Sequence, residues 1–128
     1  MRSRRYIGFG ALLLVVLAAA VVGAGLLPAA ATAATVKRVA IKNMAFTPQT
    51  ITVKAGTKVT WKNADGVVHD VTSADSMKTT AKVTGLFASA SLSNGQKFSF
   101  TFKKKGTFYY VCTLHASMAS MHGKVIVK

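Results

Sequence analysis

The chain has 128 residues, and its 17 Lys and Arg side chains against only 3 acidic ones give a formal net charge of +14. Three Asp and no Glu leave very little for the paired-carboxylate chemistry of glycosidases and aspartic proteases, and the length provides for one small core. The composition therefore excludes a second domain and argues against most hydrolase mechanisms.

The first 34 residues have the order of a secretory signal peptide. Basic residues at positions 2, 4 and 5 precede an apolar run over residues 6–27, and small residues complete the segment. Ala31-Thr32-Ala33 fits the pattern that signal peptidase cuts, which predicts a mature chain starting near Ala34 or Thr35. The apolar run also reaches the about 20 residues that an uncleaved membrane anchor needs. Arg4-Arg5 loosely resembles a twin-arginine export signal.

Residues 1–34 therefore predict export to the periplasm or another extracytoplasmic part of the cell envelope, with membrane contact only if they stay attached. Residues 35–128 form the predicted domain. Exported proteins usually pair their cysteines, yet Cys112 is the single cysteine of the chain. It is then expected to be an intermolecular bridge, a reactive thiol or a metal thiolate.

The predicted domain begins with short apolar runs of period two, the pattern of strands that bury one face. Lysines and threonines alternate with the inward residues, which are Val39 and Ile41, Ile51 and Val53, and Val59 and Trp61. Pro48 and Ala55-Gly56-Thr57 fall between these runs, where turns form. The first half is therefore predicted to be a meander of consecutive strands.

The second half contains a less regular stretch and then two clear strands. Residues 72–95 are rich in Ser, Thr, Ala and Lys and predict a long irregular connection with one short strand or turn of helix. Lysines 103–105 predict a turn between two aromatic runs whose inward residues are Phe98, Phe100, Phe102, Phe108, Tyr110 and Cys112. Val125 and Val127 are expected to face the core from a last strand.

These seven or eight strands predict an all-β fold, a two-sheet antiparallel β-sandwich. The spacing of the aromatic residues assigns them to its core and not to a nucleic-acid stacking platform, so no nucleic acid is expected as a partner.

The residues that carry chemistry lie in one short segment. Cys112 and His115 are three residues apart, and Met118 and Met121 follow them. A third strong ligand has to come from elsewhere, and His69 fits because it follows a loop near the end of the strand predicted over residues 67–71. Two imidazoles, a thiolate and a weak thioether favour copper and keep its two oxidation states in similar geometry.

The domain resembles the cupredoxin family of blue copper proteins, plastocyanin and amicyanin in particular, over nearly all of residues 36–128. The matching pieces are Met44-Ala45-Phe46-Thr47-Pro48, Ile51-Thr52-Val53, Gly56, Val59-Thr60-Trp61-Lys62-Asn63, His69, Gly95 with Phe98, Gly106 with Tyr110, and Cys112-Thr113-Leu114-His115 followed by Met121-His122-Gly123-Lys124-Val125. The resemblance implies a Greek-key sandwich with one type 1 copper ion at one end, under an apolar rim through which electrons pass.

Three departures affect what the resemblance implies for the site. Five residues separate His115 from Met121 and two separate it from Met118, whereas plastocyanin-like chains have four and amicyanin-like chains two. We expect Met121 to be the axial ligand because it directly precedes the last strand, with Met118 as the alternative. Asp70 replaces the usual Asn after the first His, which predicts a lower reduction potential. Val111 replaces the aromatic residue that precedes the Cys in plastocyanins.

The leading functional prediction is an electron carrier, not an enzyme, that accepts and donates single electrons by Cu(II)/Cu(I) cycling. Its alternative is a copper-sequestering or copper-delivery protein of the envelope. The basic surface predicts acidic redox proteins as electron donor and acceptor, and the protein is expected to be a monomer. The remaining histidine, His122, is expected to point into solvent.

Overall fold

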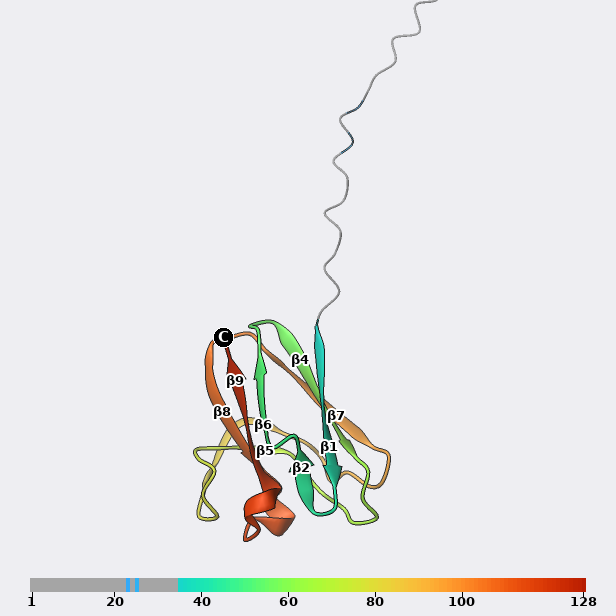
Figure 1. Ribbon diagram of the computed structural model, residues 1–128, viewed down its shortest axis with the longest axis vertical. Coiled ribbons are helices and arrows are strands. Elements are labelled where there is room, and N and C mark those ends of the chain that lie inside the picture. Colours follow the sequence, from blue (N-terminus) through green and yellow to red (C-terminus); the bar gives the residue numbers. More distant parts are fainter. Residues whose placement is uncertain (1–22, 24, 26–34) are drawn as a thin grey trace, which may run out of the picture. The chain divides into compact units, whose positions relative to one another are not determined.

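The computed structural model describes residues 23, 25 and 35–128 (Figure 1). The predicted signal peptide or anchor over residues 1–34 lies outside the described residues, apart from Gly23 and Gly25. Within the described part of the chain, no helix is long and apolar enough to cross a bilayer.

Residues 36–127 fold into two packed β-sheets, as the period-two patterns predict. One sheet has four strands in the order β2-β1-β4-β7, and the other has five in the order β3-β9-β8-β5-β6. The strands are β1 (Val36–Lys42), β2 (Ala45–Thr47), β3 (Thr50–Val53), β4 (Thr57–Asn63), β5 (Thr72–Ala74), β6 (Val83–Ala88), β7 (Lys97–Phe102), β8 (Gly106–Val111) and β9 (His122–Val127). Two 3₁₀ turns, η1 (Thr113–His115) and η2 (Ala119–Met121), connect β8 to β9. The all-β sandwich is therefore confirmed, with nine strands in the described residues.

The core lies between the sheets and is built from the inward residues of each alternating strand. Val39 and Ile41 in β1 and Val59 and Trp61 in β4 are buried, while their neighbours along the strands are mostly exposed or half-buried. Trp61 packs edge-on against Tyr110 of the opposite sheet, with ring centroids 5.2 Å apart. Burial of aromatic rings of this size is the main source of stability in such a small domain.

The predicted meander in the first half is wrong. β1 pairs in parallel with β4, and β3 pairs in parallel with β9 in the other sheet, so the chain changes sheets after β2 and again after β3. Alternation of apolar and polar residues fixes which face of a strand is buried but does not name its neighbour. The sandwich is accordingly mixed, although most of its strand pairs are antiparallel.

The prediction for residues 72–95 is also wrong, because this segment contains both β5 and β6. The two strands pair with each other, and β5 joins β8. β6 is an edge strand in which only Phe87 is buried, so its sequence has almost no apolar alternation. Before them, the strand predicted over residues 67–71 is reduced to a single bridge between His69 and Leu92.

The two ends of the sandwich differ. Figure 1 shows η1 and η2 at one end and the C-terminus at the other, where Lys103–Lys105 form the predicted turn between β7 and β8. At the end with the 3₁₀ turns, the Ser120 hydroxyl donates to the Met44 carbonyl, which follows β1. Asp70, in the loop after β4, accepts the backbone N–H of Thr113, in the loop after β8, so these two loops also meet at this end.

Candidate metal centre

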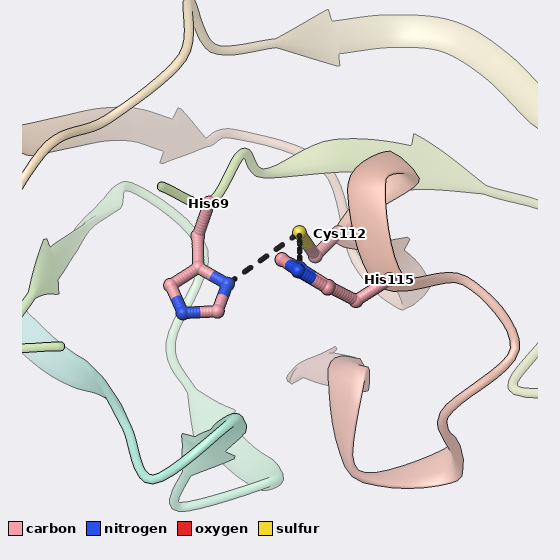
Figure 2. A group of neighbouring side chains, drawn as sticks. All are labelled: His69, Cys112 and His115. Carbon is pink, nitrogen blue, oxygen red and sulfur yellow. Dashed lines mark hydrogen bonds between the residues drawn. The ribbon is translucent and has the colours of Figure 1, made fainter. Parts of the chain in front are cut away.

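Three side chains from two separate loops converge at this end of the sandwich (Figure 2). His69 follows the loop after β4, Cys112 follows β8 directly, and His115 ends η1. The Cys112 Sγ atom lies 3.7 Å from His69 Nδ1 and 3.4 Å from His115 Nδ1. All their ligand atoms lie within 4.8 Å of one another. The structure thus brings together the two histidines and the cysteine that the sequence singles out.

These separations fit one small metal ion. Metal–nitrogen and metal–sulfur bonds of about 2.0 to 2.3 Å in a trigonal plane place ligand atoms about 3.7 Å apart. The observed distances from the sulfur are close to that value, and both imidazoles present Nδ1 toward it. A thiolate with two imidazoles is a donor set that suits copper, whereas Mg²⁺ and Ca²⁺ prefer oxygen ligands.

The three candidate ligand side chains differ in their exposure. His69 and Cys112 are fully buried, while His115 is partly exposed. Burial raises the pKa of the Cys112 thiol, and the nearby Asp70 carboxylate raises it further, against an opposing effect of backbone N–H groups. A metal therefore has to displace a proton from this sulfur when it binds.

Asp65 orients His69, a role that the sequence reasoning missed. Its Oδ2 atom lies 2.9 Å from His69 Nε2, and both of its oxygens also accept backbone N–H groups, from Asn43 and Met44. Asn43 and Met44 have φ angles of 52° and 54°, a left-handed turn that directs these two groups at the carboxylate. Burial opposes the charge, yet these hydrogen bonds hold the pKa of Asp65 below its usual value.

Because the Asp65 carboxylate can only accept a hydrogen bond, His69 Nε2 carries the proton, and the lone pair of His69 Nδ1 faces Cys112. The four-residue spacing of Asp65 and His69 is the sequence signal that could have found this contact.

Asp70 ties the two ligand loops together. One carboxylate oxygen accepts the Thr113 backbone N–H at 2.8 Å, and the other accepts the Thr113 hydroxyl. The Asp70 backbone N–H in turn donates to Cys112 Sγ at 3.4 Å. The Asp70 carboxylate only accepts hydrogen bonds, as expected from the sequence, whereas an asparagine in its place could both accept and donate them.

The two methionines have different surroundings. Met121 is fully buried in the core cluster that contains Cys112, and its carbonyl accepts the Cys112 backbone N–H at 2.9 Å. Met118 is 38% exposed, and Leu114 is 53% exposed. With the partly exposed Ala116, these two side chains are the apolar rim that we expect around His115.

The expectation that His122 points into solvent is wrong. Its side chain is fully buried, and its Nε2 donates to the Ala116 carbonyl at 2.7 Å. The physical reason is the fold of residues 116–121, which turn back over the ring and bring a carbonyl to it. The buried His122 side chain therefore stabilises the loop between β8 and β9 through this hydrogen bond.

A family model for copper binding proteins, the plastocyanin/azurin family, matches residues 33–128. The chain belongs to this family. The match covers every strand and every side chain of the site, so copper is the metal that the converging donors are suited to hold. When bound, copper supplies a one-electron Cu(II)/Cu(I) couple.

Individual relatives agree with the family assignment. Amicyanin-alpha from Methylorubrum extorquens is 34% identical over 97% of this chain and 99% of its own. The chloroplastic plastocyanin of Silene latifolia subsp. alba is 35% identical over 66% of this chain and 53% of its own. Among solved structures, a purple cupredoxin from Nitrosopumilus maritimus aligns with a TM-score of 0.63 and 29% identity, covering 71% of this chain and 98% of that one. The cupredoxin fold expected from the sequence is therefore confirmed.

Proposed function

We propose that the protein is an exported carrier of single electrons, in which His69, Cys112 and His115 bind one copper ion in the equatorial plane. The observation that carries this proposal is the convergence of a buried thiol and two imidazole Nδ1 atoms, one of them on a partly exposed ring inside an apolar rim. The buried ligands exclude water and resist rearrangement, while the His115 edge gives a partner close access.

The same geometry argues against a catalytic thiol. Cys112 and His115 are near enough for the imidazole to act as a base, but the sulfur has no exposed surface through which a substrate carbon could reach it. We therefore assign no catalysed reaction to this site.

Met121 is our proposed axial ligand, and Met118 is assigned to the rim. Burial beside Cys112 supports Met121, whereas Met118 is exposed. Replacing a weak sulfur ligand by a hydrocarbon destabilises Cu(II) more than Cu(I). Met121→Leu is expected to raise the reduction potential and to alter the electron paramagnetic resonance spectrum of Cu(II). Met118→Leu serves as the matched control, and a larger effect of Met118→Leu would move the axial role to that residue.

Electron carriage and copper delivery lead to different behaviour of the loaded protein. A carrier keeps its metal and exchanges electrons rapidly between Cu(I) and Cu(II) molecules, which broadens nuclear magnetic resonance lines of His115 in a mixed sample. A delivery protein passes Cu(I) to a competing chelator as fast as the chelator binds it. Rapid self-exchange with slow loss of copper supports the proposal, and the reverse pattern supports delivery.

Export and acidic partners are further parts of the proposal. Without the three arginines of residues 1–5, 14 of the 17 basic side chains remain against 3 acidic ones, a surface that attracts acidic redox proteins. Mass spectrometry of envelope proteins should find an N-terminus near Ala34 or Thr35. An intact chain that fractionates with membranes would show that residues 6–27 remain as an anchor.

A further inference from the structure

The outer face of the four-stranded sheet carries only basic and neutral side chains. Because Val39, Trp61 and Phe98 are paired across β1, β4 and β7 and point into the core, the residues that alternate with them point away from it. We call the resulting surface the basic sheet face, and its exposed charged residues are Arg38, Lys42, Lys58, Lys62 and Lys97.

No acidic group of the described chain neutralises these charges. Asp65 and Asp70 are engaged at the metal centre, and Asp75 lies beyond β5 in the other sheet. Among the residues that the structure describes, no Lys or Arg lies within 4.0 Å of a carboxylate, since the one ion pair joins His69 and Asp65. The positive charge of the basic sheet face is therefore directed at solvent.

Three of the lysines gather at the metal end of the face. Lys62 in β4 is directly opposite Lys97 in β7, an arrangement that destabilises a sheet when both charges are alike. Ala40 of β1 is directly opposite Lys62, and Lys42 lies two residues further along β1. Strand geometry therefore places the Cα of Lys42 about 8 Å from that of Lys62. Repulsion among three cations so close together is relieved when an external anion binds.

This lysine cluster is continuous with the support of the metal ligands. Lys42 precedes Asn43, whose backbone N–H donates to the Asp65 carboxylate that holds His69. Lys62 precedes Asn63, whose side chain donates to the carbonyls of Val67 and Leu92 and so fixes the loop that carries His69. A molecule bound to the cluster consequently lies beside the metal end of the sandwich, not at its far end.

We infer that Lys42, Lys62 and Lys97 form the docking site for an acidic patch on the redox partner. This inference rests on the proposed electron-carrier function and adds the surface through which the partner is held. Charge attraction orients the partner at the cluster, and the neighbouring apolar rim makes the close contact. One electron then passes from the reduced partner to Cu(II), which leaves Cu(I) and the one-electron oxidised partner.

The test compares two triple variants of the copper-loaded protein with the same change in net charge. One is Lys42→Gln/Lys62→Gln/Lys97→Gln, and its matched control is Lys103→Gln/Lys104→Gln/Lys105→Gln in the turn at the far end. The probe is the reduced soluble domain of cytochrome b5, an acidic haem protein whose Fe(II) becomes Fe(III) as Cu(II) is reduced. Stopped-flow rates are measured at low salt, with ascorbate as a small reductant to check each copper site.

We expect the first variant to slow reduction by the haem protein by about tenfold or more and the control variant by about threefold or less. Equal slowing by both variants would show that net charge alone steers the partner and would overturn the docking site. A second result would also overturn the docking site: the first variant reacts at the rate of the unmodified protein but no longer sediments with vesicles of phosphatidylglycerol. The basic sheet face would then bind an anionic membrane. Failure of ascorbate to reduce the unmodified protein would instead contradict the proposed function itself.

Discussion

Asp70 places a carboxylate beside this metal centre, at the position where the family resemblance implies an asparagine. Its carboxylate lies next to the ligand thiol and accepts both polar groups of Thr113. Asp70→Asn retains the shape and one acceptor while it removes a negative charge, so Cu(I) becomes relatively more stable. We expect the reduction potential to rise by on the order of 50 to 100 mV.

Protein-film voltammetry measures this change, with Asp75→Asn as the control. Asp75 is exposed beyond β5, and its replacement removes the same charge away from the site. A potential that falls in Asp70→Asn, or that rises equally in both variants, would show that the Asp70 charge does not act on the metal.

Tyr110 makes stability depend on pH in the alkaline range. Its hydroxyl is buried and has no hydrogen-bond partner among the described residues, and burial raises the pKa of Tyr110 to about 12. In the unfolded chain the phenol ionises near its ordinary pKa of about 10, so the unfolded state releases the proton first and stability falls as pH rises from about 10 to about 12.

Tyr110→Phe is expected to abolish this loss. Between about pH 9 and about pH 11, the unmodified protein should lose about 1.4 kcal/mol more unfolding free energy than the variant does. Urea titrations at both pH values measure the difference. Identical pH dependence in the two proteins would place the Tyr110 hydroxyl in contact with water.

Individual site residues were predictable only where their chemistry is rare in the sequence. One cysteine and three histidines leave few ways to assemble a soft metal site, which is why Cys112, His115 and His69 could be selected. Asp65 and His122 were not recognised, because their roles depend on a turn and on a folded-back loop that bring their partners to them. Such partners are set by tertiary structure and leave little pattern in the chain.

At the level of the elements, the pairing of β8 with β9 depends on a glycine. Gly123 lies directly opposite Tyr110, and a Cβ atom added there would overlap the phenol ring and its hydroxyl. Gly123→Ala therefore has to displace a fully buried ring or separate the strands. We expect it to destabilise the protein by about 1 to 3 kcal/mol, as overpacked cores do.

Thermal unfolding of the copper-loaded protein tests this effect, with Gly66→Ala as the control. Gly66 has no atom within 4 Å of the position its Cβ would take, so that variant should keep the stability of the unmodified protein. If Gly123→Ala were equally stable, Tyr110 would have to occupy another rotamer.

The elements with clear alternation were predicted, and those without it were not. β1, β3, β4, β7 and β9 each place apolar residues on one face and could be located from the sequence. β5 has three residues and β6 buries only Phe87, so no hydrophobic pattern marks these strands. Hydrogen bonds that the Ser73 hydroxyl accepts from the Thr84 hydroxyl and the Phe87 backbone N–H hold them together instead. The parallel pairing of β1 with β4 could not be predicted from the sequence, because it depends on how the chain crosses between the two sheets.

On the scale of the whole molecule, the two ends of the sandwich contain different groups of residues. One end contains the donor atoms, their hydrogen-bonded supports and the apolar rim, and the lysine cluster lies beside it on the basic sheet face. The other end contains the C-terminal end of β9 and the turn of Lys103–Lys105. The rigid β-core between them holds the ligand loops in one arrangement, which keeps the reorganisation that accompanies electron transfer small.

The most direct test of a copper-thiolate centre is the visible spectrum of the purified protein after addition of Cu(II). We predict an intense absorption from charge transfer between the Cys112 thiolate and Cu(II), which is retained in Met118→Leu and abolished in Cys112→Ser. A colourless Cu(II) complex of the unmodified protein, or a Cys112→Ser variant with undiminished absorption, would contradict the account.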